Sequence, residues 1–302
     1  MIKIKKHLLS ISDLTKKEIL QLFQLTKELK KHRFNNKLKN KNVALIFQKP
    51  STRTRVSFEA GINQLSGDSL VLNWNDLQLG RGETVEDTAK VLGLYVDAIV
   101  ARVYEHEDLV KMTKSTNVPI INSLSNLEHP CQILGDLFTI YEHFRRLNNL
   151  KLAYIGDGNN VCNSLLLGCA IVGLDISVAS PKGYEPDKNV VKKARSLSKS
   201  RIVILNRPEK AVKEANILYT DVWVSMRQEK EKRKRLKIFK KYQINNFLLK
   251  KANKNVMVMH CLPAHRGMEI TSDVMDGHQS LIWKQANNRL HIEKAILLKL
   301  LK

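Results

Sequence analysis

The stretch Leu152-Ala153-Tyr154-Ile155-Gly156-Asp157-Gly158-Asn159-Asn160 joins an apolar run of strand length to a short polar turn and the start of a helical segment. Apolar runs of the same length recur at 176–179, 201–205, 217–219 and 256–259, with helical patterns between them. Strands that are apolar almost throughout are typical of parallel sheets covered on both faces. The second half of the chain therefore predicts a parallel α/β domain.

The first half shows the same alternation. Strands are predicted at 43–47, 98–101 and 118–121, and helices over about 52–65 and 130–147. The apolar periodicity lapses into polar residues at 145–150, which marks a domain boundary. We predict two open parallel-sheet α/β domains, residues 1–146 and 147–284, with the active site in the cleft between them. A final helix over about 285–302 is expected to pack back on the first domain.

The composition is that of a globular protein, with 43% hydrophobic and 26% charged residues among 302. The net charge of +22 suggests nucleic acid, an anionic membrane or an anionic small substrate as a partner. Much of the excess lies in 1–41, with 12 Lys and Arg against 3 Asp and Glu, and in 227–241, with 9 against 2. Neither stretch interleaves aromatic and basic residues, so we favour solvated helix faces over a nucleic-acid site.

Two features indicate the compartment. No apolar run approaches the roughly 20 residues that span a bilayer, and 1–10 carries too many lysines for a secretory signal. The four cysteines are sparse for the length and form no C-x-x-C pair, which favours reduced thiols over a disulfide framework. The sequence therefore predicts a cytoplasmic protein.

Polar side chains follow the predicted strands of the first half. Ser51-Thr52-Arg53-Thr54-Arg55 comes after the strand at 43–47 and opens a helix, where hydroxyls, arginine and free backbone N–H groups suit a phosphate-sized anion. The alternative is a plain Ser/Thr N-cap. Arg102 ends the next strand. His129 precedes Pro130 at a helix start, where the dipole favours a neutral ring, and Gln132 lies one turn further on. This pair suits a carbonyl and an amide.

The strands of the second half also end in polar residues. Gly156-Asp157-Gly158 lacks the third glycine of a dinucleotide fingerprint, and Asn159-Asn160 suits a polar small molecule instead. Asp221 follows the strand at 217–219 and suits an ammonium group. After the strand at 256–259, His260, Cys261 and His265 leave three alternatives open: metal ligands, a nucleophilic cysteine, or a thiol positioned beside an amine substrate.

Taken in order, these motifs resemble the ornithine branch of the aspartate/ornithine carbamoyltransferase family from about residue 8 to 300. The resemblance rests on Ser-Thr-Arg-Thr-Arg at 51–55, His-Pro-Cys-Gln at 129–132, Asp-x-Trp-x-Ser-Met at 221–226 and His-Cys-Leu-Pro at 260–263. It implies transfer of the carbamoyl group of carbamoyl phosphate to the δ-amino group of L-ornithine, giving L-citrulline and phosphate. It also implies trimers or multiples of trimers with shared sites, no cofactor and no metal.

The resemblance assigns roles by motif position. The carbamoyl-phosphate-binding residues would be Ser51, Thr52, Arg53, Thr54, Gln78, Arg102, His129, Gln132, Cys261, Leu262 and Arg289, with Gln78 offered to a neighbouring subunit. The ornithine-binding residues would be Asn160, Asp221, Ser225 and Met226. The catalytic residues would be Arg102, His129 and Cys261.

One position departs from the family pattern. Arg227 follows Met226 where the family has glycine, which allows a left-handed backbone that arginine resists. Carbamoyl transfer to a related amine such as putrescine is the alternative activity. Asp221, Ser225 and Met226 favour an acceptor with a free amino-acid head over that alternative.

Overall fold

The computed structural model describes residues 7–197, 200–224 and 229–301. The chain divides into two compact units: Met1–Phe138 with Asn288–Lys302, and Thr139–Asn287. Two helices run across these divisions, α5 (Pro130–Phe144) and α12 (Ile282–Leu300). Each unit is built on its own parallel sheet, in agreement with the predicted fold class.

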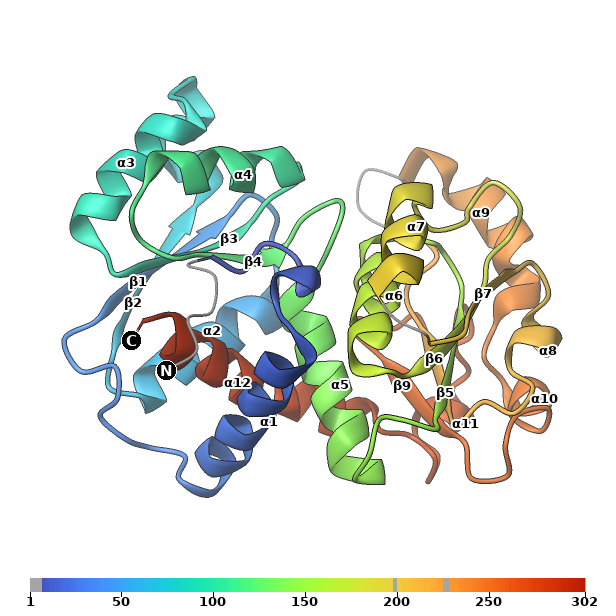
Figure 1. The fold of residues 1–302 in the computed structure, drawn as a ribbon. Helices are drawn as coiled ribbons and strands as arrows, with labels where there is room; N and C mark the ends of the chain where they lie inside the picture. The colour runs from blue at the N-terminus through green and yellow to red at the C-terminus, as the bar shows by residue number, and fades with distance from the viewer. Residues whose placement is uncertain (1–6, 198–199, 225–228, 302) are drawn as a thin grey trace. The chain divides into compact units, whose positions relative to one another are not determined.

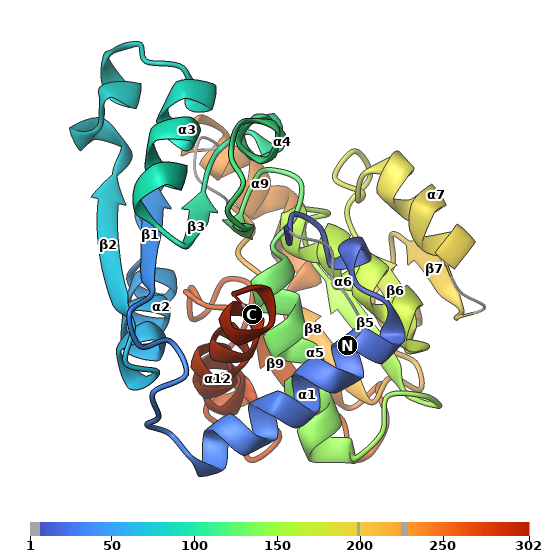
Figure 2. The same ribbon diagram turned by 60° about the vertical axis from the view of Figure 1, so that its left-hand side comes forward.

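The first unit has a four-stranded sheet in the order β2-β1-β3-β4, with every pairing parallel. Its strands are β1 (Asn42–Phe47), β2 (Asp68–Asn73), β3 (Ala98–Arg102) and β4 (Ile120–Leu124). Helices α3 (Val85–Tyr95) and α4 (His106–Ser115) cover one face, while α2 (Thr52–Gln64) and α12 lie on the other (Figures 1 and 2). Short 3-10 turns lie at Ile11–Asp13, Trp74–Asp76 and Gln78–Arg81.

The N-terminal helix α1 (Lys16–Lys31) begins at a capping box. The Thr15 hydroxyl accepts from the backbone N–H of Glu18, and the Glu18 carboxylate accepts from the backbone N–H of Thr15. This reciprocal arrangement satisfies N–H groups that the first helical turn leaves without partners. The helix buries Ile19, Leu22, Phe23 and Leu29 along one stripe.

The second unit has a five-stranded parallel sheet in the order β7-β6-β5-β8-β9. Its strands are β5 (Lys151–Ile155), β6 (Asp175–Ala179), β7 (Ile202–Leu205), β8 (Ile217–Thr220) and β9 (Met257–His260). Helices α6 (Asn160–Val172) and α7 (Lys188–Leu197) lie together on one side, and α8 (Pro208–Ala211), α9 (Lys232–Phe239) and α10 (Asn246–Leu249) lie on the other (Figure 1). The remaining short elements are α11 (Ser272–Met275) and 3-10 turns at Glu229–Glu231 and Lys240–Tyr242.

Four elements differ from the sequence prediction, among them α12, which begins at Ile282 rather than at about residue 285. Strand β2 was missed because its apolar run, Leu70–Leu72, is short and flanked by polar residues, as an edge strand that is partly exposed permits. Strand β4 begins two residues later than expected, at Ile120, and α5 ends at Phe144 rather than at Leu147. Among the helices of the described ranges, none has the length and apolar character of a membrane span.

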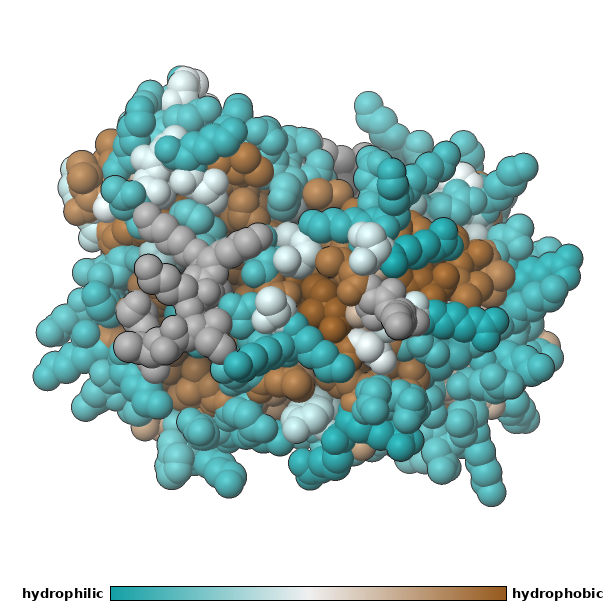
Figure 3. Space-filling model, viewed as in Figure 1, coloured by the Kyte–Doolittle hydropathy of each residue, from teal (hydrophilic) through white to brown (hydrophobic). Residues whose placement is uncertain are grey.

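The surface in Figure 3 is mostly hydrophilic, in line with a net charge of +22 and 51 Lys and Arg residues. Beneath it, the apolar side chains of the central strands are almost fully buried, as in Val43–Ile46 of β1 and Leu152–Ile155 of β5. The polar residues of interest follow the carboxyl ends of these buried strands. In a parallel sheet those ends share one edge, where open α/β sheets bind ligands.

Candidate active site

The anion-binding motif of the first unit lies where β1 leads into α2. Ser51 caps the helix, because its hydroxyl accepts from the backbone N–H of Thr54 at 3.3 Å. The Ser51 hydroxyl also donates to the Thr54 hydroxyl at 3.1 Å. Thr52 and Arg53 are exposed in the first turn. The N-cap and the anion-binding hypotheses are therefore compatible, since one hydroxyl caps the helix while its neighbours face outward.

Two further residues come from the ends of β3 and β4. Arg102 is the last residue of β3 and is 8% exposed, at a point where the register between β3 and β4 shifts. His129 follows β4 and is 4% exposed. Burial lowers the pKa of His129 well below 6.5, and the positive charges of Arg289, Arg102 and Lys49 lower it further. The ring is therefore neutral at pH 7, as predicted, with burial as the largest cause.

Arg289 connects α12 to this group of residues. Its Nη1 donates to Gln132 Oε1 at 2.6 Å, and its Nη2 donates to Thr54 Oγ1 at 3.2 Å. The Gln132 amide in turn donates to Asp136 Oδ1 at 2.8 Å. Thr54, Gln132 and Arg289 thus lie together in the first unit, although 235 residues separate the first from the last.

Glu293 holds Arg289 from the next turn of α12. Its Oε1 accepts from Arg289 Nε at 3.0 Å and from Nη2 at 2.9 Å, and the carboxylate is fully buried. Burial raises the pKa of Glu293, while the Arg289 charge opposes that shift. Glu293 was not predicted as a site residue, although its i,i+4 spacing from Arg289 is the usual spacing of a helical ion pair.

Gln78, the residue expected to serve a neighbouring subunit, begins the 3-10 turn Gln78–Arg81 and is exposed. The turn ends at Gly82, whose φ of +103° is a conformation that favours glycine. Gln78 is thus placed where a second chain can reach it.

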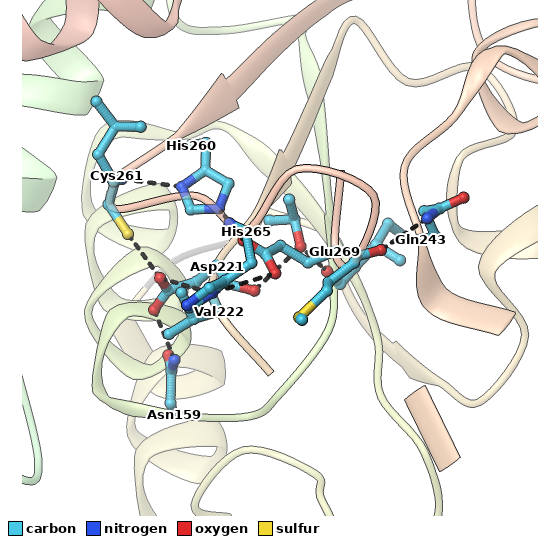
Figure 4. A network of polar contacts seen from close by, with 12 residues as sticks. Asn159, Asp221, Val222, Gln243, His260, Cys261, His265 and Glu269 are labelled. Carbon is cyan, nitrogen blue, oxygen red and sulfur yellow. Dashed lines mark hydrogen bonds and ion pairs between the residues drawn. The ribbon is translucent and has the colours of Figure 1, made fainter. Parts of the chain in front are cut away.

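Asp221 is the centre of the polar network in the second unit (Figure 4). Its Oδ1 accepts from Cys261 Sγ at 2.9 Å and from the backbone N–H of Val222 at 2.8 Å. Its Oδ2 accepts from Asn159 Nδ2 at 2.7 Å. Loops after β5, β8 and β9 therefore meet at one carboxylate that is 6% exposed.

Two buried side chains, His260 and Glu269, hydrogen-bond to the loop after β9. His260 Nδ1 accepts from the backbone N–H of Leu262 at 2.9 Å, and its Nε2 lies 3.2 Å from Glu269 Oε1. The same Glu269 oxygen accepts from the backbone N–H of His265 at 2.6 Å. Leu262 has a φ of +60°, which is strained for a branched side chain and is sustained here by these contacts.

Asp221, His260 and Cys261 have potential metal-ligand atoms within 4.8 Å of one another. This set differs from the His260, Cys261 and His265 considered in the sequence. Both ring nitrogens of His260 are already engaged, one by Leu262 and the other by Glu269. Cys261 instead lies beside a carboxylate, as a positioned thiol would.

Not every predicted residue of this unit can be placed. Ser225 and Met226, and also Arg227, lie outside the described residues. Asn160 begins α6, and its Oδ1 accepts from the backbone N–H of Val161 at 3.0 Å. Asn159, to which the family resemblance assigned no substrate, is the asparagine that contacts Asp221 and caps α6. The Asn-Asn pair indicated a polar binding loop, but the sequence did not indicate which of the two asparagines contacts Asp221.

The two units thus carry two half-sites of different chemistry. The first combines arginines, hydroxyls and a neutral histidine, which suit an anionic group and a polarised carbonyl. The second combines a carboxylate, an asparagine and a thiol, which suit an amino-acid head and an amine. These are the two chemistries that an enzyme needs when it transfers a group from an anionic donor to an amine.

Comparison with known proteins identifies the family. The carbamoyl-phosphate-binding domain of the aspartate/ornithine carbamoyltransferases matches residues 6–142, and their aspartate/ornithine-binding domain matches residues 148–300. The chain belongs to the aspartate/ornithine carbamoyltransferase family.

Similar proteins extend over nearly the whole chain. An ornithine carbamoyltransferase of Archaeoglobus fulgidus is 51% identical over 300 residues, covering 98% of this chain and 97% of its own. One of Methanocaldococcus jannaschii is 49% identical over 296 residues, covering 96% and 97%. The solved structure of ornithine carbamoyltransferase from Pyrococcus furiosus has a TM-score of 0.94 at 48% identity, covering 98% of this chain and 97% of its own.

Proposed function

We propose that this protein transfers the carbamoyl group of carbamoyl phosphate to the δ-amino group of L-ornithine, giving L-citrulline and phosphate. The observation that carries this proposal is the hydrogen bond of 2.9 Å from Cys261 Sγ to Asp221 Oδ1. It joins the His-Cys-Leu-Pro loop to a carboxylate that suits the acceptor's ammonium group. The near full-length similarity to ornithine carbamoyltransferases supports the same reaction.

The chemistry follows from the two half-sites. The neutral δ-nitrogen attacks the carbamoyl carbon, and negative charge develops on the carbonyl oxygen, where Arg53, Arg102 and neutral His129 supply donors. The C–O bond to phosphate then breaks, and the departing phosphate takes the proton released by the nitrogen. Holding both reactants in line contributes on the order of 7 kcal/mol through proximity.

Residue roles follow the motif positions. Ser51, Thr52, Arg53, Thr54 and Arg102 bind the phosphate, His129, Gln132 and Arg289 bind the carbamoyl group, and Cys261 with the Leu262 backbone lies beside the reacting atoms. Asn160, Asp221, Ser225 and Met226 bind the α-amino and α-carboxylate groups of ornithine. Residues 1–146 with the final helix form the carbamoyl-phosphate-binding domain, and residues 147–284 form the ornithine-binding domain.

The working assembly is a trimer, or a multiple of trimers, in which Gln78 reaches a neighbouring subunit's site. Exposed apolar side chains support an interface on the first unit: Val91, Leu94 and Tyr95 of α3 are 44–81% exposed. Figure 3 shows hydrophobic atoms at the upper left of the surface, where Figure 1 draws α3. Apolar side chains gathered on a surface commonly mark protein interfaces.

The cytoplasm is the proposed compartment. None of the four cysteines, all of which lie in the described ranges, forms a disulfide, and three of them are buried. Free thiols persist in a reducing compartment.

The reaction is tested with carbamoyl phosphate and four acceptors in parallel: L-ornithine, putrescine, L-aspartate and N-acetylornithine. Ureido product and phosphate are both measured. We expect citrulline from ornithine alone and loss of turnover in Arg53→Ala. Preference for putrescine would show that Asp221 does not bind the amino-acid group of the acceptor. Absence of turnover with every amine would overturn the proposal.

The shared site is tested by complementation. Gln78→Ala and Arg53→Ala subunits are purified as inactive homo-oligomers, mixed, dissociated and reassembled. Hybrids regain activity if Gln78 of one chain serves the site of another, because some sites then carry both native residues. Failure to regain activity in hybrids of confirmed composition would contradict sharing.

A further inference from the structure

A buried ion pair lies behind the ornithine half-site, outside the set of residues assigned to either substrate. Arg235 of α9 is 3% exposed, and its Nη2 lies 2.5 Å from Asp157 Oδ2, which belongs to the loop after β5. The Arg235 Nε also donates to the backbone oxygen of Trp223 at 2.6 Å, two residues after Asp221. One guanidinium therefore holds the loops that follow β5 and β8.

The surroundings fix the guanidinium in place. It lies 4.7 Å from the centre of the Tyr184 ring and 5.1 Å from that of Phe239, so aromatic faces enclose it. The backbone N–H of Gly158 donates to the backbone oxygen of Tyr184 at 2.9 Å, which connects the Asp157 loop to the residue whose ring packs on Arg235. Cation, carboxylate and aromatic rings form one packed cluster.

The loops held by this cluster carry the residues of the half-site. From Asp157 the chain continues to Asn159, whose amide donates to Asp221, and to Asn160 at the start of α6. The Tyr154 hydroxyl donates to the Asp157 backbone oxygen at 2.8 Å, which fixes the same turn from β5. A shift of either loop would change where Asn159 and Asn160 stand relative to Asp221.

We propose that Arg235 and Asp157 are positioning residues for the amino-acid substrate: their ion pair sets the two loops that carry Asn159, Asn160 and Asp221. This inference rests on the proposed function, since it assumes that ornithine binds in this half-site. Neither residue needs to touch the substrate. Loss of the pair would weaken ornithine binding and leave carbamoyl phosphate binding intact.

The pair also gives the half-site a pH dependence. Burial raises the pKa of Asp157 to about 6, against the charge of Arg235 and with smaller contributions from Asp221 and Glu231. The other titratable groups beside it are the Tyr154 hydroxyl and the Cys162 thiol, whose pKa values burial raises, so both are neutral near pH 6. Below pH 6 Asp157 gains a proton and the attraction to Arg235 is lost.

The test compares Arg235→Met, Arg235→Lys, Asp157→Asn and the double variant Arg235→Met/Asp157→Asn. Arg233→Met is the matched control, because Arg233 is exposed on the same helix. KM values for both substrates, the melting temperature, and the inhibition constant of L-norvaline from pH 5.5 to 8 are measured. L-norvaline has ornithine's amino-acid head without the δ-amine, so neither of its charges changes over this range.

We expect Arg235→Met and Asp157→Asn to raise KM for ornithine about tenfold, with KM for carbamoyl phosphate within about twofold of wild type. Arg235→Lys keeps a charge for Asp157 and restores part of the loss. In wild type the norvaline constant rises as pH falls through about 6, and in Asp157→Asn it does not. The double variant recovers melting temperature, because no unpaired charge stays buried, but keeps the raised KM.

Other outcomes overturn the inference. Wild-type KM for ornithine in Arg235→Met would contradict it, and so would KM values that merely follow melting temperature through the series, double variant included. Equal effects on both substrates would assign the pair a purely structural role. A wild-type enzyme that forms no citrulline would instead refute the proposed function, so the two failures are distinguishable.

Discussion

Replacing Arg289 by methionine is expected to separate the stability of the first unit from its function. The substitution removes the guanidinium that bridges Gln132 and Thr54 and leaves the Glu293 carboxylate fully buried without its cation. Removing one partner of a buried ion pair costs about 3–5 kcal/mol. We therefore expect the free energy of unfolding to fall by about that amount at pH 7, less whatever protonation of Glu293 recovers.

The effect on catalysis is independent of the effect on stability. A charge-assisted hydrogen bond contributes about 1.5–3 kcal/mol, so loss of the Arg289 donors should lower kcat/KM for carbamoyl phosphate by about 10- to 150-fold. The double variant Arg289→Met/Glu293→Leu buries no charge. It should regain most of the unfolding free energy but none of the activity.

Urea denaturation and steady-state kinetics on wild type, Arg289→Met, Glu293→Leu and the double variant measure the two effects. The reasoning is refuted if Arg289→Met unfolds with wild-type free energy, since Glu293 would then not depend on its cation. It is equally refuted if the double variant regains catalysis along with stability. That result would mean that Arg289 acts only through the fold.

Three further variants test other parts of the structure. His129→Asn should flatten the fall in unfolding free energy below pH 6.5, because the native state keeps this ring neutral whereas the unfolded state takes up a proton. The wild-type protein loses up to about 1.4 kcal/mol of unfolding free energy per pH unit in this way. Unfolding free energies from pH 5 to 7 measure the slope, and the same slope in wild type and variant would contradict the prediction. Lys294→Met should destabilise the first unit by about 2–4 kcal/mol at pH 7, because the buried ammonium donates to the backbone oxygens of Leu29 and Arg33 and to Gln64. Since burial lowers the pKa of Lys294 to about 8, wild-type stability should also gain with rising pH between about 8 and 10.4, and the variant should lose this gain in denaturation curves. Gly158→Ala would bring a methyl carbon against the backbone nitrogen of Pro186, so the KM for ornithine should rise, and wild-type kinetics in this variant would refute the close approach.

The fold class was predictable because the central strands are apolar on both faces. Continuous apolar runs such as Val43–Phe47 and Leu152–Ile155 are recognisable in the sequence alone. Helix starts such as Thr15 are recognisable too, because the capping residues are only three positions apart. Strand β2 carries a weaker signal, since an edge strand that is partly exposed to solvent needs only the short apolar run Leu70–Leu72 between polar residues. The prediction was therefore best where burial is complete.

The candidate site was predictable as a set of strand ends but not as a set of contacts. The rule that parallel sheets bind ligands at their carboxyl edges pointed to Arg102, His129 and Asp221. Arg289 came only from the family resemblance, because it lies on a helix, and its contact with Thr54 spans 235 residues. The sequence offers no reason to separate Arg235 from the other lysines and arginines of the basic segment 227–241, which predicts a solvated helix face. Its partner Asp157 lies on a distant loop, and spacing gives no hint of such a pair.

A crystal structure with carbamoyl phosphate and L-norvaline bound tests the assignment of the two half-sites most directly. The account predicts phosphate at Ser51–Thr54 and Arg102, the carbamoyl group at His129, Gln132 and Arg289, and the norvaline head at Asn160 and Asp221. Norvaline bound to the first unit, or carbamoyl phosphate held without Arg102 and Arg289, would contradict the account.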